Sequence, residues 1–273
     1  MMAQLTVIRP RKGLIGIDMK ELYSYRELLW SFTVRNIKVR YKQTVIGGFW
    51  AILQPFLTMV VFTIFFGKVA KIPSEGVPYA IFSYSGLLLW TYFSNSVSSS
   101  STSLVSSSGL ISKIYFPRII LPLSFTMVRI IDYSIAWLIM AGLMAYYRFV
   151  PPVYILLLPL VIFFTWMFAS GIGFWLSAMN VKYRDVGHAV PFLVQLMMFM
   201  TPVIYPVSIA GRFKVLLMLN PITGFIEAHR AMILGHQAVD FTLLGVSVVL
   251  TLIVFITGLM YFRSVERYFA DVI

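Results

Sequence analysis

The feature that most constrains this chain is an uncharged segment, residues 45–67, that directly follows a basic one. A helix rises about 1.5 Å per residue, so a run of this length crosses the ~30 Å hydrocarbon core of a bilayer. The residues before it include Arg35, Lys38, Arg40 and Lys42. Such cationic flanks are typical of the cytoplasmic side of a membrane helix. The segment therefore predicts a membrane protein, not a soluble domain.

Similar apolar stretches recur along the chain, and they predict an all-α membrane protein with six transmembrane helices. Hydrophobic residues make up 59% of the sequence and charged residues only 12%, which is outside the soluble range. A further apolar piece, 215–226, is too short to span and contains Asn220 and Pro221. It predicts re-entrant outer half-helices between the fifth and sixth spans. The predicted spans are 45–67, 79–104, 119–146, 149–179, 189–205 and 241–262.

The distribution of Lys and Arg predicts that both termini are cytoplasmic. With six spans, the cytoplasmic segments hold fifteen of these residues and the outer loops hold six. The predicted organisation is a cytoplasmic N-terminal segment (1–44), a single transmembrane domain (45–262) and a cytoplasmic tail (263–273). The net charge of +12 would suggest nucleic acid in a soluble protein. Here the basic residues gather at membrane-facing ends, so we expect lipid headgroups or a peripheral protein, and no nucleic acid, as partners.

Residues 22–42 predict an amphipathic helix that lies along the membrane surface. Apolar residues recur at helical spacing as Trp30, Val34, Ile37 and Tyr41, beside a basic stripe of Arg35, Lys38 and Lys42, and Arg40 is assigned to the same interface helix. The alternative is a basic flank without defined structure.

Two features inside the predicted membrane region have competing interpretations. Arg129 and Asp132 are the only charged residues within a span, and their i, i+3 spacing predicts an ion pair. The pair either locks the third helix against its neighbours or provides a polar contact along a conduit. The serine-rich stretch 93–112 is either a flexible linker or a hydroxyl-rich helix end at a pore mouth.

The sequence lacks the residues of several common catalytic sites. It contains no cysteine and no G-x-x-x-x-G-K-[ST] phosphate loop, and no H-E-x-x-H motif. We therefore expect no metal, no cofactor and no catalytic residue in this chain.

Four motifs, in order along nearly the full chain, resemble a known family, the ABC-2 type permeases that export polysaccharides and polyol-phosphate polymers. The first is Arg35-x-x-Lys38-x-Arg40-Tyr41-Lys42-x-Thr44-x-x-Gly47-x-x-Trp50-x-x-x-x-Pro55. The others are Lys113-Ile-Tyr-Phe-Pro117-Arg118-x-x-Leu-Pro122, Asn180-Val-Lys-Tyr-Arg-Asp185 and Leu219-Asn-Pro221-x-x-x-Phe-Ile-Glu227-x-x-Arg230.

The resemblance implies a homodimer that binds two copies of a separate ATPase, which supplies ATP and Mg, in the inner membrane. It implies export of a lipid-linked polysaccharide, with O antigen as the predicted polymer. The alternatives are teichoic acid or capsule polymer, a small-molecule exporter of the same fold, and a membrane glycosyl- or phosphotransferase. The predicted ATPase-coupling residues are Lys113, Ile114, Tyr115, Phe116 and Arg118 in one loop and Tyr183, Arg184 and Asp185 in another.

Two further sets of residues are candidates for the export path. Aromatic rings stack on sugar faces without fixed charge, which suits a sliding polymer, although each ring could equally face lipid or pack between helices. The channel-lining candidates are Phe56, Phe62, Phe66, Phe199 and Tyr205. The outer-gate candidates are Asn220, Pro221, Glu227 and Arg230.

Overall fold

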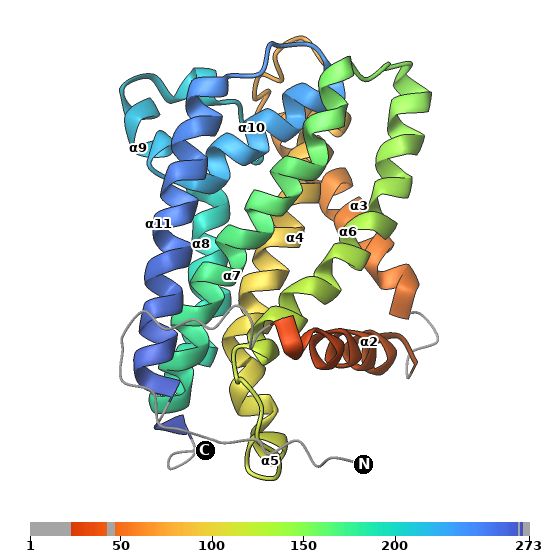
Figure 1. Cartoon of the computed structure of the whole chain (residues 1–273). Coiled ribbons are helices and arrows are strands. Elements are labelled where there is room, and N and C mark those ends of the chain that lie inside the picture. The colour runs from red at the N-terminus through yellow and green to blue at the C-terminus, as the bar shows by residue number, and fades with distance from the viewer. Residues whose placement is uncertain (1–22, 43–46, 267, 270–273) are drawn as a thin grey trace.

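The computed structural model describes residues 23–42, 47–266 and 268–269, where helices are joined by loops and turns and no strand is present. An all-helical fold is therefore confirmed. The predicted N-terminal segment before residue 23 and the start of the first predicted span lie outside the described residues. Long helices run side by side in a bundle (Figure 1). They are α3 (Gly47–Phe62, continued by η1, Thr63–Val69), α4 (Tyr79–Ser106), α6 (Ile120–Tyr147), α7 (Leu158–Lys182, preceded by η2, Val153–Leu157), α8 (Asp185–Met200) and α11 (Phe241–Glu266).

Within the part of the chain that the structure describes, four helical stretches are both long and apolar enough to cross a membrane. They are Phe49–Val69, Ile120–Tyr147, Val153–Lys182 and Phe241–Glu266. Among the other two predicted spans, α8 has 16 residues with Pro191 inside it, and it occupies 185–200 where the sequence predicted 189–205. The structure thus supports a multi-pass membrane protein, and six crossings remain a prediction.

The remaining predicted span, α4, is the central helix of the bundle. It is 28 residues long and packs against α3, α6, α7, α8 and α10. Because these neighbours cover it, its side chains need to fit protein and not lipid, which explains how a helix with so many serines occupies the centre of an apolar bundle.

The serine-rich stretch is helical and not a flexible linker. Its hydroxyls donate to carbonyl oxygens three or four residues earlier, as Ser101 does to Ser98 at 2.8 Å and Ser103 to Ser100 at 2.7 Å. The side chains of Ser96, Ser100 and Ser103 are buried among neighbouring helices. A serine hydroxyl that donates to a carbonyl of its own helix needs no water, and the side chain is small, so neighbouring helices can pack closely against it.

Two glycines set the contact between α7 and α11. A Cβ added at Gly258 would overlap the carbonyl oxygen of Gly171, and a Cβ added at Gly171 would lie 2.8 Å from the backbone of Phe255. The helices can therefore approach closely only because both positions lack a side chain.

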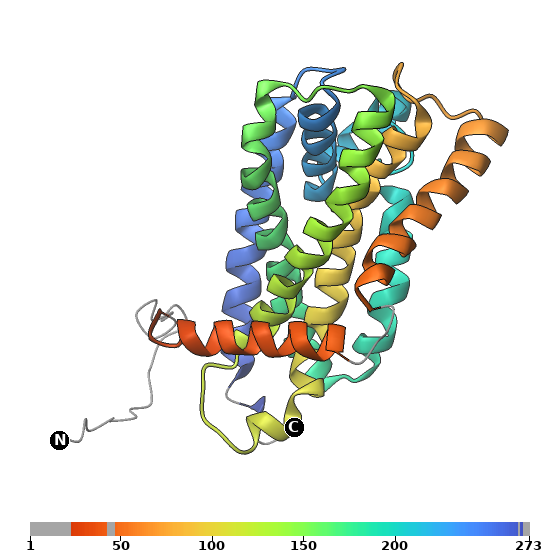
Figure 2. The same ribbon diagram turned by 90° about the vertical axis from the view of Figure 1, so that its right-hand side faces the viewer.

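A short helix, α2 (Arg26–Lys42), crosses one end of the bundle and packs against α6 (Figure 2). The prediction of a helix in this region is confirmed. Its direction is transverse to the bundle axis, as expected for a helix that lies along a membrane surface.

The opposite end of the bundle carries α9 (Lys214–Met218) and α10 (Pro221–Leu234), close to the start of α11 (Figure 1). α10 has 14 residues, which at about 1.5 Å each is too short to cross a bilayer. Nearly all of its side chains are buried against α4, α7 and α11. These features agree with the expected half-helices, although a re-entrant path remains a prediction.

Candidate functional site

The loop after α5 (Ser108–Ile111) exposes Ser112, Lys113, Ile114 and Tyr115 and buries Phe116. Ile114 is 53% exposed and Tyr115 is 70% exposed, whereas Phe116 is 4% exposed. The ring of Phe116 meets the ring of Phe32 on α2 edge-on, with 5.4 Å between centroids. The sequence predicted that these loop residues act together in coupling to an ATPase. The structure separates them: Lys113, Ile114 and Tyr115 are available for contact, and Phe116 anchors the loop to α2.

Arg118, at the end of this loop, attaches it to the last turn of α11. Its backbone N–H donates to the Glu266 carboxylate at 3.0 Å, and its guanidinium donates to the Glu266 backbone carbonyl. The other carboxylate oxygen of Glu266 lies 3.0 Å from the Arg263 guanidinium. The loop is therefore tied both to α2 and to α11. No sequence pattern indicated the contact between Arg118 and Glu266, because the two residues lie 148 positions apart along the chain.

The second predicted loop lies between α7 and α8, at the same end of the bundle as the first (Figure 1). Tyr183 is 55% exposed, and Arg184 and Asp185 are also exposed. Asn180 holds the turn in place, because its amide donates to the Ser101 carbonyl at 3.0 Å and accepts from the Gly187 N–H at 2.9 Å. The structure thus brings both predicted docking loops to one face.

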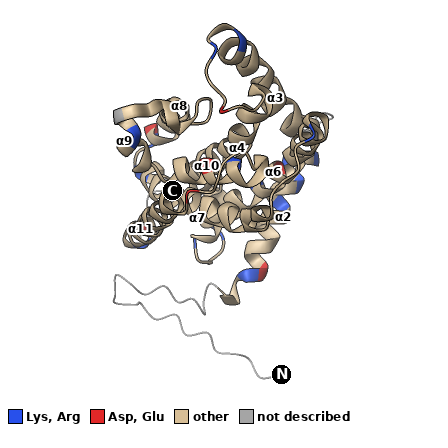
Figure 3. Cartoon of the chain, turned by 90° about the horizontal axis from the view of Figure 1, so that it is seen from above, with Lys and Arg blue, Asp and Glu red and all other residues tan. Residues whose placement is uncertain are grey.

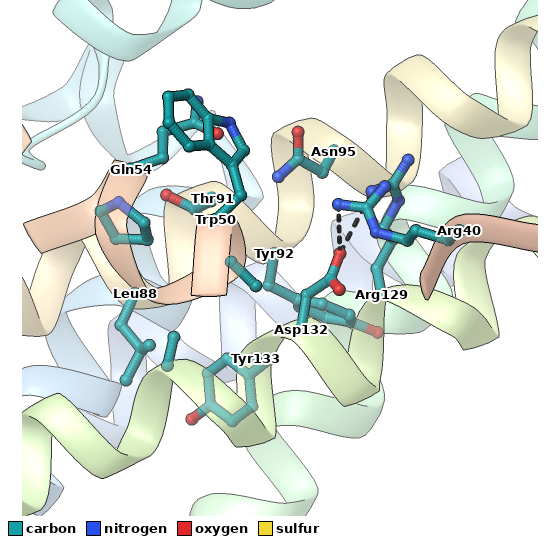
Figure 4. Close-up of a pocket in the computed structure, with 13 residues that line it drawn as sticks. Arg40, Trp50, Gln54, Leu88, Thr91, Tyr92, Asn95, Arg129, Asp132 and Tyr133 are labelled. Carbon is teal, nitrogen blue, oxygen red and sulfur yellow. Dashed lines mark hydrogen bonds and ion pairs between the residues drawn. The ribbon is translucent and has the colours of Figure 1, made fainter. Parts of the chain in front are cut away.

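The predicted intramembrane pair exists, but it has a third member. The Arg129 guanidinium lies 3.1 Å from Oδ2 of Asp132, and the Arg40 guanidinium lies 2.9 Å from the same oxygen. Tyr41 donates to the other carboxylate oxygen. Burial, and then the hydrogen bond to Asp132, raise the pKa of the Tyr41 hydroxyl to about 12. The sequence assigned Arg40 only to the interface helix, and the structure adds its contact with Asp132 of α6 (Figure 4).

The buried face of α2 also differs from the predicted stripe. Phe32 and Thr33 are its buried residues, and the Asn36 amide donates to Ser124 of α6 at 3.3 Å. Trp30 is 64% exposed and lies on the outside. The predicted basic residues Arg35, Lys38 and Lys42 are exposed as well. The outer side of α2 is therefore aromatic and cationic, the combination that suits a headgroup layer.

At the other end of the molecule, Arg230 on α10 is the largest fully buried side chain. It pairs with Glu227 at 2.7 Å and donates to the backbone carbonyls of Pro202 and Val203, each at 3.1 Å. Its guanidinium also lies over the ring of Phe82 on α4, 3.9 Å from the centroid. The two outer-gate candidates Glu227 and Arg230 thus form an i, i+3 ion pair, and the arginine additionally holds the chain that follows α8.

Asn220 and Pro221 lie at the start of α10. The Asn220 amide donates to the Thr201 hydroxyl at 3.0 Å, and Pro221 is the first residue of the helix, where its missing N–H removes no helical hydrogen bond. The outer-gate candidates therefore form one connection between α10 and the end of α8.

The channel-lining candidates divide between exposed and packed positions. Phe56 is 39% exposed and Phe199 is 50% exposed. Phe62 and Phe66 pack edge-on against each other, with 5.3 Å between centroids, and Tyr205 donates to the Phe199 carbonyl at 3.1 Å. All five come from α3 and its continuation or from α8 and the turn after it. These two helices lie on the same side of the bundle and flank α4 (Figures 2 and 3).

Similarity to known proteins covers most of the chain. The family model described as ABC-2 type transporter matches residues 27–234. The chain is 32% identical over 240 residues to the O-antigen export system permease protein RfbA of Myxococcus xanthus, covering 85% of this chain and 91% of that protein. It is 25% identical over 262 residues to the protein of the same name from Klebsiella pneumoniae, covering 95% and 100%. It is 22% identical over 247 residues to the polysialic acid transport protein KpsM of Escherichia coli, covering 86% and 92%.

Proposed function

The chain belongs to the ABC-2 type transporter family, and from this membership we propose that it is the permease subunit of an ABC exporter for a lipid-linked polysaccharide. O antigen is the polymer that we assign, in the inner membrane of a bacterium with both termini cytoplasmic. The observation that carries the proposal is the similarity over 85% of the chain to a permease whose name specifies O-antigen export. The similarity to KpsM keeps a capsule-type polymer as the alternative.

ATP hydrolysis is assigned to a separate subunit, which would hold ATP and Mg. The sequence has no phosphate loop of its own. The loops after α5 and after α7 lie at the same end of the bundle. Their exposed residues Tyr115 and Tyr183 offer aromatic contacts of the kind that are enriched in protein interfaces. The contact between Arg118 and Glu266 gives a route by which movement of the first loop would reach α11, and α11 packs against α10 at the other end.

The export path is assigned to the side of the bundle formed by α3 and α8, in a homodimer. Both helices expose large apolar side chains along their length, including Trp50 and Phe56 on α3 and Phe192 and Phe199 on α8. Two copies facing each other would enclose these aromatic side chains, which provide weak, repeated contacts for a polymer.

Deletion of the gene tests this proposal. Loss of the exporter should leave completed polymer in the cytoplasm and remove it from the cell surface, and the wild-type gene should restore it. A tagged chain should copurify with an ATPase in equal subunit numbers. Normal surface polymer after deletion, together with altered resistance to small molecules, would support the small-molecule exporter instead. Polymer that is not synthesised at all would support a transferase.

A further inference from the structure

The segment between α8 and α10 is held firmly in its first part. The backbone carbonyls of Pro202 and Val203 accept hydrogen bonds from Arg230, each at 3.1 Å, and the Ile204 carbonyl accepts one from the Tyr79 hydroxyl at 2.7 Å. All three of these accepting residues are buried. Because Tyr79 belongs to α4 and Arg230 to α10, this part of the segment is fixed to two helices of the bundle.

The later part of the same segment packs loosely. It consists of η3 (Val207–Phe213) and α9, and every residue of α9 is exposed or half-buried. Within η3, Gly211 has φ +50° and ψ −123°, a backbone conformation that other residues rarely adopt. A Cβ added at Gly211 would meet no atom within 4 Å, so the bend and not the packing requires glycine. Low burial and a glycine bend are typical of a segment that can move while the bundle stays in place.

The loop between η1 and α4 reaches η3 through Glu75. The Ser208 hydroxyl donates to Oε1 of Glu75 at 2.8 Å, and Oε2 of Glu75 lies 3.5 Å from Nε2 of His236, in the turn after α10. The Glu75 side chain is 12% exposed and therefore largely covered, whereas Ser208 is exposed. One carboxylate thus joins three parts of the chain, which are the loop after η1, η3 and the turn before α11.

The loop that carries Glu75 has a strained backbone. Lys71 and Glu75 have φ angles of +51° and +56°, in the left-handed region that residues other than glycine rarely adopt. Such strain persists only where surrounding contacts hold it, and it is concentrated at switch regions and ligand clamps. The contacts of Glu75 with Ser208 and His236 link it to residues far along the chain. Their loss would let the loop relax, which favours release once the first contact breaks.

The contact between Glu75 and Ser208 lies at the outer end of the proposed export side. Glu75 follows α3 and η1 in the chain, and Ser208 follows α8, so their hydrogen bond connects the segments that continue the two helices flanking α4 (Figure 3). Because Ser208 is exposed, water can replace its hydrogen bond, and a bond of this kind contributes only a modest net free energy. The connection can therefore hold η3 in place and still be released in a transport cycle.

We propose that Glu75 is a latch that holds η3 and α9 closed against the loop after η1, and that this latch opens when polymer leaves at the outer side. In the closed state Glu75 accepts from Ser208 and lies beside His236. In the open state η3 and α9 move away from the loop, with Gly211 as the bend, while residues 202–204 stay attached to α4 and α10. The closed latch rests on the contacts alone, and its opening during export rests on the proposed function.

Labelling of a cysteine in η3 tests the closed latch in the full-length chain. The sequence contains no cysteine, and Val207 is 8% exposed and adjoins Ser208, so Val207→Cys should react slowly with an impermeant maleimide in nanodiscs. Added to this variant, Glu75→Ala should raise the labelling rate about tenfold or more, which corresponds to about 1.4 kcal/mol, and Ser208→Ala should raise it as well. Lys71→Ala is the matched control, because Lys71 lies in the same loop with a positive φ and an exposed side chain. It should change the rate less than about twofold.

Equal labelling rates in Glu75→Ala and Lys71→Ala would overturn the latch, because they would show that the carboxylate does not hold η3. An increase in Glu75→Ala without one in Ser208→Ala would overturn it as well, because it would show a general loosening of the loop.

The opening step is tested with Glu75→Cys and Ser208→Cys in one chain. A short bifunctional methanethiosulfonate should join the two thiols and stop glycan export by the chain with its ATPase, and a reductant should restore export. The reagent should not change export by either single-cysteine variant. Export that continues in the cross-linked chain would overturn the opening step. The labelling experiment needs no export, so a chain that shows the closed latch but exports no glycan in any form would refute only the proposed function.

Discussion

Shortening Phe116 to alanine should destabilise the protein, whereas shortening its neighbour Tyr115 should not, although both lie in the same loop. Phe116 is 4% exposed and packs edge-on against Phe32, while Tyr115 is 70% exposed. Removing a buried phenylalanine ring costs about 3–5 kcal/mol, and exposed substitutions usually stay within about 0.5 kcal/mol. At roughly 2 °C per kcal/mol, Phe116→Ala should lower the melting temperature by about 6 °C or more, and Tyr115→Ala by about 1 °C or less.

The melting temperatures of Phe116→Ala and Tyr115→Ala are measured by tryptophan fluorescence of the purified protein during heating in detergent. Phe32→Ala is the matched control, because it removes the other ring of the same contact and should destabilise the protein to a similar extent. The docking role of Tyr115 is measured by ATP-driven export with the partner ATPase. The Tyr115→Ala variant should fold normally and export poorly. A melting temperature of Tyr115→Ala as low as that of Phe116→Ala would refute the division between a docking residue and an anchor. Full export by Tyr115→Ala would remove its docking role.

Three further predictions concern other parts of the molecule. Asp132→Ala should lower detergent stability by about 3–5 kcal/mol, because it leaves two guanidiniums without their shared carboxylate. The double substitution Arg129→Met with Asp132→Leu should lower stability less, because it leaves only Arg40, the more exposed of the two arginines, without the carboxylate. A double-mutant cycle that shows no coupling between Arg129 and Asp132 would contradict the pairing. In this cysteine-free chain, Arg212→Cys and Gln237→Cys should both react with an impermeant thiol reagent from outside, because the segment between them is expected to return to the same side; labelling of one position alone means that it crosses the membrane. Burial lowers the pKa of the His236 imidazole below 6.5, so the folded state disfavours its charged form, and stability should fall as the pH drops below about 7. His236→Asn should flatten the pH dependence of the melting temperature, and an unchanged dependence would assign it to another group.

The sequence was sufficient to predict the features that depend on residues close together in the chain. Length and apolarity identified the stretches that form α3, α6, α7 and α11, because a helix needs only local hydrogen bonds and a span needs only enough apolar residues. The same reasoning predicted α2 from its periodicity and the Arg129–Asp132 contact from its i, i+3 spacing.

Prediction was least reliable for the faces and ends of these helices. The periodic stripe on α2 placed Trp30 with the apolar side, yet Phe32 and Thr33 are the residues that α6 covers. The fifth predicted span, 189–205, is displaced from α8, because the first turn of α8 begins with the charged residue Asp185 and an apolar pattern does not detect it. A helix that meets both protein and lipid has no single hydrophobic face for a pattern to detect.

Only the tertiary structure decided which residues act together. It placed Arg40 on the oxygen that Arg129 already contacts, packed Phe116 against Phe32, and joined Arg118 to Glu266, 148 residues further along the chain. Each of these contacts links residues that are distant in sequence. Their distances depend on how whole helices pack and how far each is rotated about its axis. That arrangement is set by the sum of many side-chain contacts over the bundle, including the close approach at Gly171 and Gly258, and no local pattern encodes it.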